Sequence, residues 1–293
     1  MRFSLHIHAL FCTLCLLIAE GCSDIVLPKG DPQLVIEGWI EDGGHPVVIV
    51  TTTVPVEREL QSIENLKDHV VRWAKVSISD GEKETVLYGG SNKSYFPPYI
   101  YTTADMKGES GKTYTLTVSY NGKTAMAKTT IPQSVPLEFI RIHEVADEND
   151  RFYLSAGICD NPYTKDHYKF FTKVMNSDST FISSFLGLND DSTMGSGITE
   201  VPIHNGTGTL TSTLNPYFSA EDRIIVKFCN MDEISYRYWS DFDEVASLSR
   251  NPIFPVTTVI STNIAGGLGY WAGYGLTRYR VSIPDSLALG KIH

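Results

Sequence analysis

The side chains that offer chemistry are five cysteines, eight histidines and 34 acidic residues. Among the thiols, Cys22 has the most informative surroundings. It comes directly after Gly21, at the end of a segment in which the run Ala9–Ala19 is almost entirely apolar. This arrangement is typical of a secretory signal whose cysteine is acylated after cleavage. We therefore predict that Cys22 is lipidated; the alternative is an ordinary signal peptide cut nearby, which leaves Cys22 as a plain thiol.

The first 21 residues have the layout of a signal peptide. Arg2 gives the short leading segment its positive charge, and the apolar run is 11 residues long. That length fits the ~7–15 residues of a signal and falls short of the ~20 needed to span a bilayer. We predict a signal peptide over 1–21 and a lipidated tether over 22–33. Acyl chains contribute ~0.8 kcal/mol per buried methylene, so such an anchor holds the folded part at a membrane.

Ser23 and Asp24 follow the predicted anchor. A small residue and an acidic one in this place resemble the export signal of Bacteroidota lipoproteins that reach the outer leaflet of the outer membrane. The resemblance implies an outer-membrane lipoprotein that faces the cell exterior. The leaflet that carries the anchor stays open at this point.

The remaining cysteines allow two interpretations. Cys12 and Cys15 form a C-x-x-C that lies inside the predicted signal and is discarded with it. Cys159 and Cys229 each follow a strand-like apolar run. They form a disulfide if the compartment is oxidising, or they stay two buried free thiols.

The sequence lacks the common catalytic and metal-binding motifs. Six histidines lie beyond the signal, and none has the H-E-x-x-H or H-x-H spacing of a zinc site. A G-x-S-x-G nucleophile motif and a calcium loop are also missing. We predict no catalytic residue, no metal, no cofactor and no enzymatic activity. A glycosidase carboxylate pair stays open, because such pairs are defined by spacing in three dimensions.

Charge and composition limit the partners. The net charge is −10, and no cluster of Lys or Arg is longer than a dipeptide. Nucleic-acid binding depends on neutralising phosphates with basic side chains. The sequence therefore indicates no nucleic-acid partner.

The pattern of strands and turns predicts a mainly β protein. Its clearest hairpin joins Thr113–Tyr120 to Lys123–Ile131 through Asn121-Gly122, a pair that favours a type I′ turn. We predict an immunoglobulin-like β-sandwich over 34–131. A proline-containing linker over 132–138 then leads to a second β-rich domain over 139–293.

One amphipathic helix is expected in the second domain, near 231–248. Asn230 and Glu233 have the spacing of a capping box. An apolar stripe follows at helical spacing: Ile234, Tyr238, Phe242, Val245 and Ala246. We expect this stripe to pack on the second sheet.

Two groups of aromatic residues are candidates for a ligand or partner surface, because aromatic rings stack on sugars and fill protein interfaces. They are Tyr95, Phe96, Tyr99 and Tyr101, and then Tyr270, Trp271 and Tyr274. The second group is interleaved with glycines in 265–275. A plainer interpretation of that segment is a bulged strand whose aromatic side chains cover the core.

Several short motifs together resemble a known family. They include V-x-E-G-W-I at 35–40, G-K-T-Y-x-L-x-V at 111–118, V-K-F-C-x-M-D at 226–232 and G-G-L-G-Y-W-A-G-Y-G at 266–275. The chain is similar over nearly its whole mature length to the Bacteroidota lipoproteins of the domain-of-unknown-function family numbered four-two-four-nine. The resemblance implies an uncharacterised lipoprotein, often encoded beside TonB-dependent outer-membrane receptors.

Three functions follow as hypotheses. The first is a non-catalytic binding or accessory module, beside a TonB-dependent nutrient importer, with a glycan or peptide as its ligand. The second is a surface-exposed hydrolase that acts on glycan or peptide. The third is a purely structural role in the envelope.

The anchor gives the first testable prediction. Replacing Cys22 with alanine removes the thiol that would carry the acyl chains, so the protein is expected to leave the membrane fraction. Fractionation together with mass spectrometry of the mature N-terminus measures this. A wild-type mature N-terminus without acyl groups would contradict the prediction.

Overall fold

The computed structural model describes residues 31–53, 67–146, 148, 150–195, 197–206, 215–248 and 259–284. The chain divides into two compact units, Met1–Pro32 and Gln33–His293. All the elements described below belong to the second unit. The predicted signal and Cys22 lie outside the described residues.

Seven strands precede the connection at 131–136. They are β1 (Leu34–Glu41), β2 (Val47–Thr52), β3 (Lys75–Ser79), β4 (Glu84–Ser91), β5 (Tyr99–Thr102), β6 (Thr113–Tyr120) and β7 (Lys123–Thr130).

Eight strands, one α-helix and a short 3₁₀ helix are described after that connection. They are β8 (Leu137–Glu144), β9 (Arg151–Cys159), β10 (His167–Val174), β11 (Ile182–Asp190), η2 (Asp191–Thr193), β12 (Ile198–Ile203), β13 (Phe218–Ser219), β14 (Arg223–Met231), α2 (Glu233–Leu248) and β15 (Leu268–Ser282).

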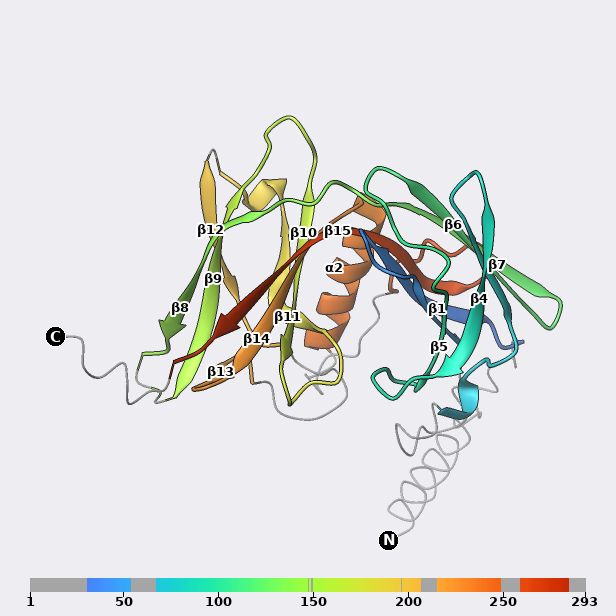
Figure 1. Cartoon of the computed structure of the whole chain (residues 1–293), viewed down its shortest axis with the longest axis horizontal. Coiled ribbons are helices and arrows are strands. Elements are labelled where there is room, and N and C mark those ends of the chain that lie inside the picture. Colours follow the sequence, from blue (N-terminus) through green and yellow to red (C-terminus); the bar gives the residue numbers. More distant parts are fainter. Residues whose placement is uncertain are drawn as a thin grey trace, which may run out of the picture. The chain divides into compact units, whose positions relative to one another are not determined.

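Strand β15 belongs to both groups of strands (Figure 1). Its first half pairs in parallel with β1, and its second half pairs antiparallel with β14. The result is one sheet of 11 strands in the order β11-β10-β14-β15-β1-β2-β5-β4-β3-β6-β7. The predicted mainly β class is confirmed, and the last strand joins the two regions that the sequence separates at 132–138.

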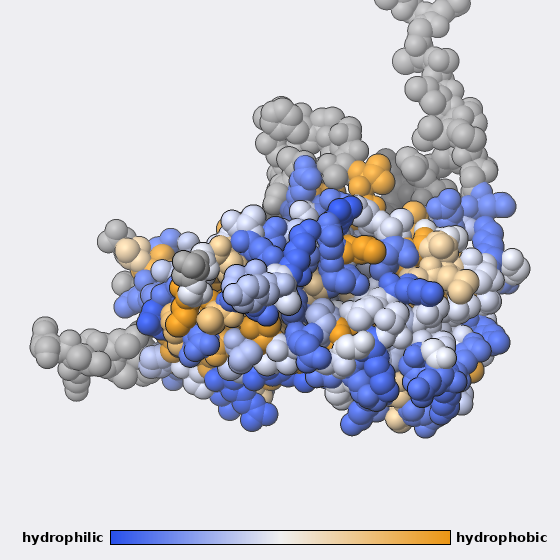
Figure 2. Space-filling model, turned by 90° about the horizontal axis from the view of Figure 1, so that it is seen from above, coloured by the Kyte–Doolittle hydropathy of each residue, from blue (hydrophilic) through white to orange (hydrophobic). Residues whose placement is uncertain are grey.

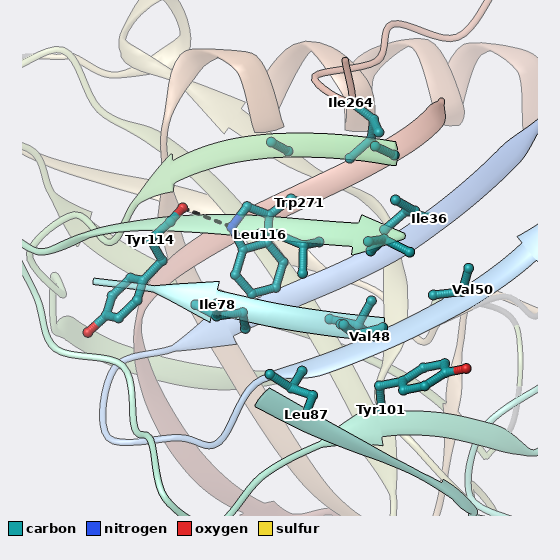
Figure 3. Close-up of a cluster of buried hydrophobic side chains, with 14 of the residues drawn as sticks. Ile36, Val48, Val50, Ile78, Leu87, Tyr101, Tyr114, Leu116, Ile264 and Trp271 are labelled. Atoms are coloured by element: carbon teal, nitrogen blue, oxygen red, sulfur yellow. Dashed lines mark hydrogen bonds between the residues drawn. The ribbon is translucent and has the colours of Figure 1, made fainter. Parts of the chain in front are cut away.

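The N-terminal part of this sheet curls until β7 lies against β15. Met126 on β7 forms an antiparallel bridge with Ala265, and the Gly273 amide donates to the Thr129 hydroxyl at 2.8 Å. Trp271 lies inside the curl, fully buried, and its indole nitrogen donates to the Tyr114 carbonyl at 3.1 Å (Figure 3). An immunoglobulin-like sandwich is not confirmed, since these strands form one continuous sheet.

Glycines make the close approach of β15 to its neighbours possible. A Cβ atom on Gly269 would lie 1.9 Å from the Ile36 carbonyl oxygen, and one on Gly275 would lie 2.1 Å from that of Pro132. Gly269 also has a φ of +103°, a backbone angle that residues with a side chain rarely adopt. The glycine-rich run is therefore a buried strand, as the plainer interpretation of the sequence has it.

The C-terminal part has three layers. A second sheet, formed by β8, β9, β12 and β13, packs on one face of β10 and β14. The core between them is apolar and includes Phe152, Phe170 and Phe228. Helix α2 covers the opposite face of the large sheet, with Trp239 packed against Phe171 and Tyr274.

Of the two local signals discussed above, the turn at Asn121-Gly122 is confirmed and the helix cap at Asn230 is not. Asn121 and Gly122 have φ of 48° and 76°, as a type I′ turn requires. The helix starts at Glu233, because β14 pairs with β10 as far as Met231 and holds Asn230 in the sheet. The predicted cap at Asn230 is therefore wrong.

The predicted apolar stripe of α2 is also shifted. Ile234 is half exposed, whereas Ser235 and Trp239 are buried. Tyr238 and Phe242 of the predicted stripe pack with Trp239 in the cluster beneath the helix, so the buried face is centred nearer to Trp239 than expected.

The close approach at Gly269 gives a stability prediction. Gly269→Ala places a methyl group against the Ile36 carbonyl and strains a positive φ, so the free energy of unfolding should fall by about 3 kcal/mol. Urea denaturation measures it. The matched control is Gly90→Ala on β4, where the added Cβ meets nothing within 4 Å and a change within about 0.5 kcal/mol is expected. Equal effects of the two substitutions would contradict the prediction.

Candidate functional site

A partly open cleft of about 350 Å³ lies where α2 begins. Three segments that are distant in sequence line it: Thr130 and Pro132 at and after the end of β7, residues 165–167 before and at the start of β10, and residues 230–233 from the end of β14 to the start of α2. This volume is at the lower end of the range for small-molecule sites.

Asp232 positions the cleft relative to the helix. Its carboxylate accepts the Ser235 amide at 2.8 Å, and its carbonyl accepts the Tyr236 amide at 3.0 Å, so Asp232 is the N-cap of α2. The second carboxylate oxygen accepts the Thr129 hydroxyl at 3.0 Å. One side chain therefore ties the start of the helix to β7.

Asn230 holds the other two segments together. Its buried amide donates to the Asp166 carboxylate at 2.7 Å and to the Gln133 carbonyl at 3.2 Å. Asp166 also accepts the Thr164 hydroxyl at 2.5 Å. The carboxylate of Asp166 is thus fixed in place at the cleft before any ligand arrives.

The lining of the cleft is acidic. Asp166, Asp232 and Glu233 carry three negative charges against the one positive charge of Lys165, which gives −2 with His167 neutral. Lys165 and Arg237 approach the Glu233 carboxylate at 3.4 and 2.7 Å. The hydrogen bond from Arg237, followed by the charge of Lys165, holds the pKa of Glu233 below its usual value, so this carboxylate stays ionised.

Two buried polar atoms next to this acidic lining have no hydrogen-bond partner in the described part of the chain. They are Nδ1 of His167 and Oγ of Ser235, on residues that are 4% and 1% exposed. The His167 ring lies 4.7 Å from the ring of Tyr236. A buried polar atom without a partner costs about 1–3 kcal/mol, so this end of the sheet carries unused hydrogen-bonding capacity beside its charges.

A serine, a histidine and a glutamate meet elsewhere, on the outer face of the four-stranded sheet. Ser155 Oγ lies 2.7 Å from His143 Nε2 and 2.5 Å from Glu200 Oε1. In a catalytic triad the acid orients the histidine and the histidine alone faces the serine. Here the carboxylate bonds the serine directly, is also paired with Arg141, and the serine is buried. The connectivity is that of a cross-strand polar network.

The aromatic residues proposed from the sequence do not form one surface. Tyr270, Trp271 and Tyr274 are all buried, as is Tyr101. The prediction that they belong to a ligand or partner surface is therefore wrong for these four. The physical reason for the three on β15 is that this strand lies inside the sheet, with the core of the curl on one face and α2 on the other. Tyr101, on β5, packs into the core of the curl.

The other three predicted aromatic residues are partly accessible. Phe96 is 39% exposed, Tyr95 packs beside Trp39, and the Tyr99 hydroxyl donates to the Arg72 carbonyl at 3.0 Å. Figure 2 shows one face of the molecule, on which hydrophilic residues predominate and hydrophobic ones lie in separate groups. The most exposed aromatic side chains of the described ranges are ones that the sequence analysis did not single out: Trp73, Tyr88 and Tyr163.

The two remaining cysteines are not paired. Cys159 is exposed at the end of β9, and Cys229 is buried on β14 under helix α2, so the proposed disulfide is not formed. Burial raises the pKa of the Cys229 thiol to about 12, which keeps it protonated. No group of three or more His, Cys, Asp or Glu side chains within the described ranges is arranged to hold a metal ion.

The chain belongs to a family of proteins described as a domain of unknown function, DUF4249, which it matches over residues 23–280. The family resemblance stated from its sequence motifs is thereby confirmed. No curated protein matches the sequence. Within the described part of the chain, none of the helices is both long and apolar enough to cross a membrane.

The amide of Asn230 gives a test of how the cleft is held. Asn230→Ala removes the donor from Asp166 and from the Gln133 carbonyl, and should lower the free energy of unfolding by about 1–3 kcal/mol. As a control, Asn92→Ala removes only a loop bond to the Ser94 amide and should cost less than about 1 kcal/mol. Chemical denaturation compares the two. The expectation fails if both variants are as stable as the wild type.

Proposed function

We propose that this protein is an envelope-anchored lipoprotein that acts as a non-catalytic binding module, with the acidic cleft at the start of α2 as its ligand site. One observation carries the proposal: two carboxylates held by hydrogen bonds from the chain line a cleft together with His167, whose buried Nδ1 has no hydrogen-bond partner among the described residues. A preorganised polar lining of this kind suits capture of a ligand. The predicted lipid on Cys22 supports a place at the outer membrane, on the exterior face.

The proposed setting is beside a TonB-dependent importer, to which the module delivers or admits its ligand. Support for this part comes from the motifs that the chain shares with lipoproteins encoded beside such receptors. The network that surrounds Asp166 and Asp232 supports a passive role, since their oxygen atoms accept hydrogen bonds from the chain itself.

The setting is tested in native membranes. The full chain, tagged at its C-terminus and purified in mild detergent from the cells that make it, should bring with it an outer-membrane receptor of the TonB-dependent class in a fixed ratio. Cys22→Ala should lose that receptor, because the protein no longer shares its membrane. A protein that is recovered alone from intact membranes would contradict the proposal.

The hydrolase alternative depends on the Ser155 network. If Ser155 acted as a nucleophile, the full chain would turn over a glycan or peptide in a substrate library, and Ser155→Ala would abolish that turnover. Because its hydroxyl donates to Glu200, we expect neither result. Turnover that depends on Ser155 would replace the binding proposal.

Filling the cleft separates ligand capture from anchoring. Thr130→Trp puts a large side chain at its rim and should prevent uptake of the nutrient that the importer serves, without releasing the protein from the membrane. Thr124→Trp is the matched control on the same strand, since both threonines are exposed and bond a hydroxyl on β6. Growth on that nutrient and membrane fractionation are measured together. Uptake that is unchanged by Thr130→Trp would exclude the cleft.

A further inference from the structure

We propose that the cleft at the start of α2 selects small ligands that carry a protonated amine on an aliphatic stem. This inference depends on the cleft being the binding site named above and adds the chemical class of its ligand. It is carried by the charge of the lining, by the acceptor capacity left on two fixed carboxylates, and by His167 in the lining, whose buried Nδ1 has no hydrogen-bond partner among the described residues.

The carboxylates have lone pairs to spare. A carboxylate has about four acceptor positions, and each of the two that are held by the chain receives only two hydrogen bonds from it. Asp166 accepts from Asn230 and Thr164, and Asp232 accepts from Ser235 and Thr129. An ammonium group has three donors and no acceptor, so it matches this lining without leaving an unpaired proton.

The chain itself contains an ammonium group at the rim. Nζ of Lys165 lies 3.4 Å from the Glu233 carboxylate, with its side chain 67% exposed. Such an exposed, long contact is weak. The ammonium group of Lys165 is therefore an internal competitor that the ammonium group of a ligand can displace.

The rest of the lining suits the remainder of such a ligand. Met231, which is buried, and Pro132 add apolar surface to the lining. His167 also lines the cleft, and its buried Nδ1 has no hydrogen-bond partner in the described part of the chain.

Anionic ligands fit this cleft poorly. The N-terminus of a helix attracts anions through its free amides and its dipole. At α2, however, Asp232 caps the helix and Glu233 lies in its first turn, so two carboxylates already occupy that position. A third negative group there would meet like charges.

The experiment uses isothermal titration of the full detergent-solubilised chain with three probes of similar size: butylammonium, butanol and butyrate. We expect butylammonium alone to bind, and to bind more weakly as NaCl is raised, because salt screens the attraction. Asp166→Asn should weaken the binding by at least about tenfold. The control Glu84→Gln, on the exposed start of β4, should leave it unchanged.

A second variant guards against loss of the fold. Lys165→Ala removes the internal competitor and should tighten the binding of butylammonium severalfold, a gain that misfolding does not produce. If butanol or butyrate binds and Thr130→Trp abolishes that binding, the cleft remains the binding site. The inference that its ligand carries a protonated amine would then be overturned. No binding of butylammonium, to the wild type or to Lys165→Ala, would overturn the inference, while recovery of the importer tests the proposed setting independently.

Discussion

The pairing of β15 with β1 on one side and β14 on the other is the constraint on which the rest of the structure depends. A strand can pass so close to its neighbours only where side chains are missing, and the glycines of 266–275 supply that condition. Gly38 on β1 likewise leaves room for the ring of Trp271, since a Cβ there would lie 2.9 Å from the indole. The curl, the helix-covered face and the cleft all take their positions from this strand.

Buried charges reinforce the same junction. Glu41 at the end of β1 bonds Lys227 on β14 and Arg278 on β15. Lys169 on β10 is fully buried and reaches Asp243 on α2 at 2.8 Å; burial lowers the pKa of its ammonium group, against the raising effect of Asp243. Such pairs add little net stability compared with apolar contacts, but breaking one is costly. These ion pairs therefore determine that β1 meets β14 and β15, and that α2 meets β10, in one specific arrangement.

The elements that the sequence predicts well are those whose partners are close along the chain. Asn121-Gly122 and the alternation on either side of it contain everything needed to form the β6–β7 hairpin. The segment around Trp271 could not be placed in this way, because its partner on β1 is more than two hundred residues away, as the separation of 233 between Tyr270 and Glu37 illustrates. Whether the aromatic side chains of this segment are exposed or buried depends only on that distant contact, which the local sequence does not reveal.

The cleft was missed for the same reason. Its lining comes from three segments, and Asp166 and Asp232 appear in the sequence as ordinary loop carboxylates. The available signal was the acidic residue directly before the helix, which marks a cap. The sequence instead predicts the helix cap at Asn230, because no local pattern reveals that β14 continues to Met231.

The shared strand also affects the order in which the chain can fold. Glu41 and Arg278 are 237 residues apart, so the N-terminal curl cannot close until nearly the whole chain has emerged. Pairings of such large sequence separation form slowly and leave hydrophobic strands open to aggregation in the meantime. With this topology, the two halves are expected to become native together.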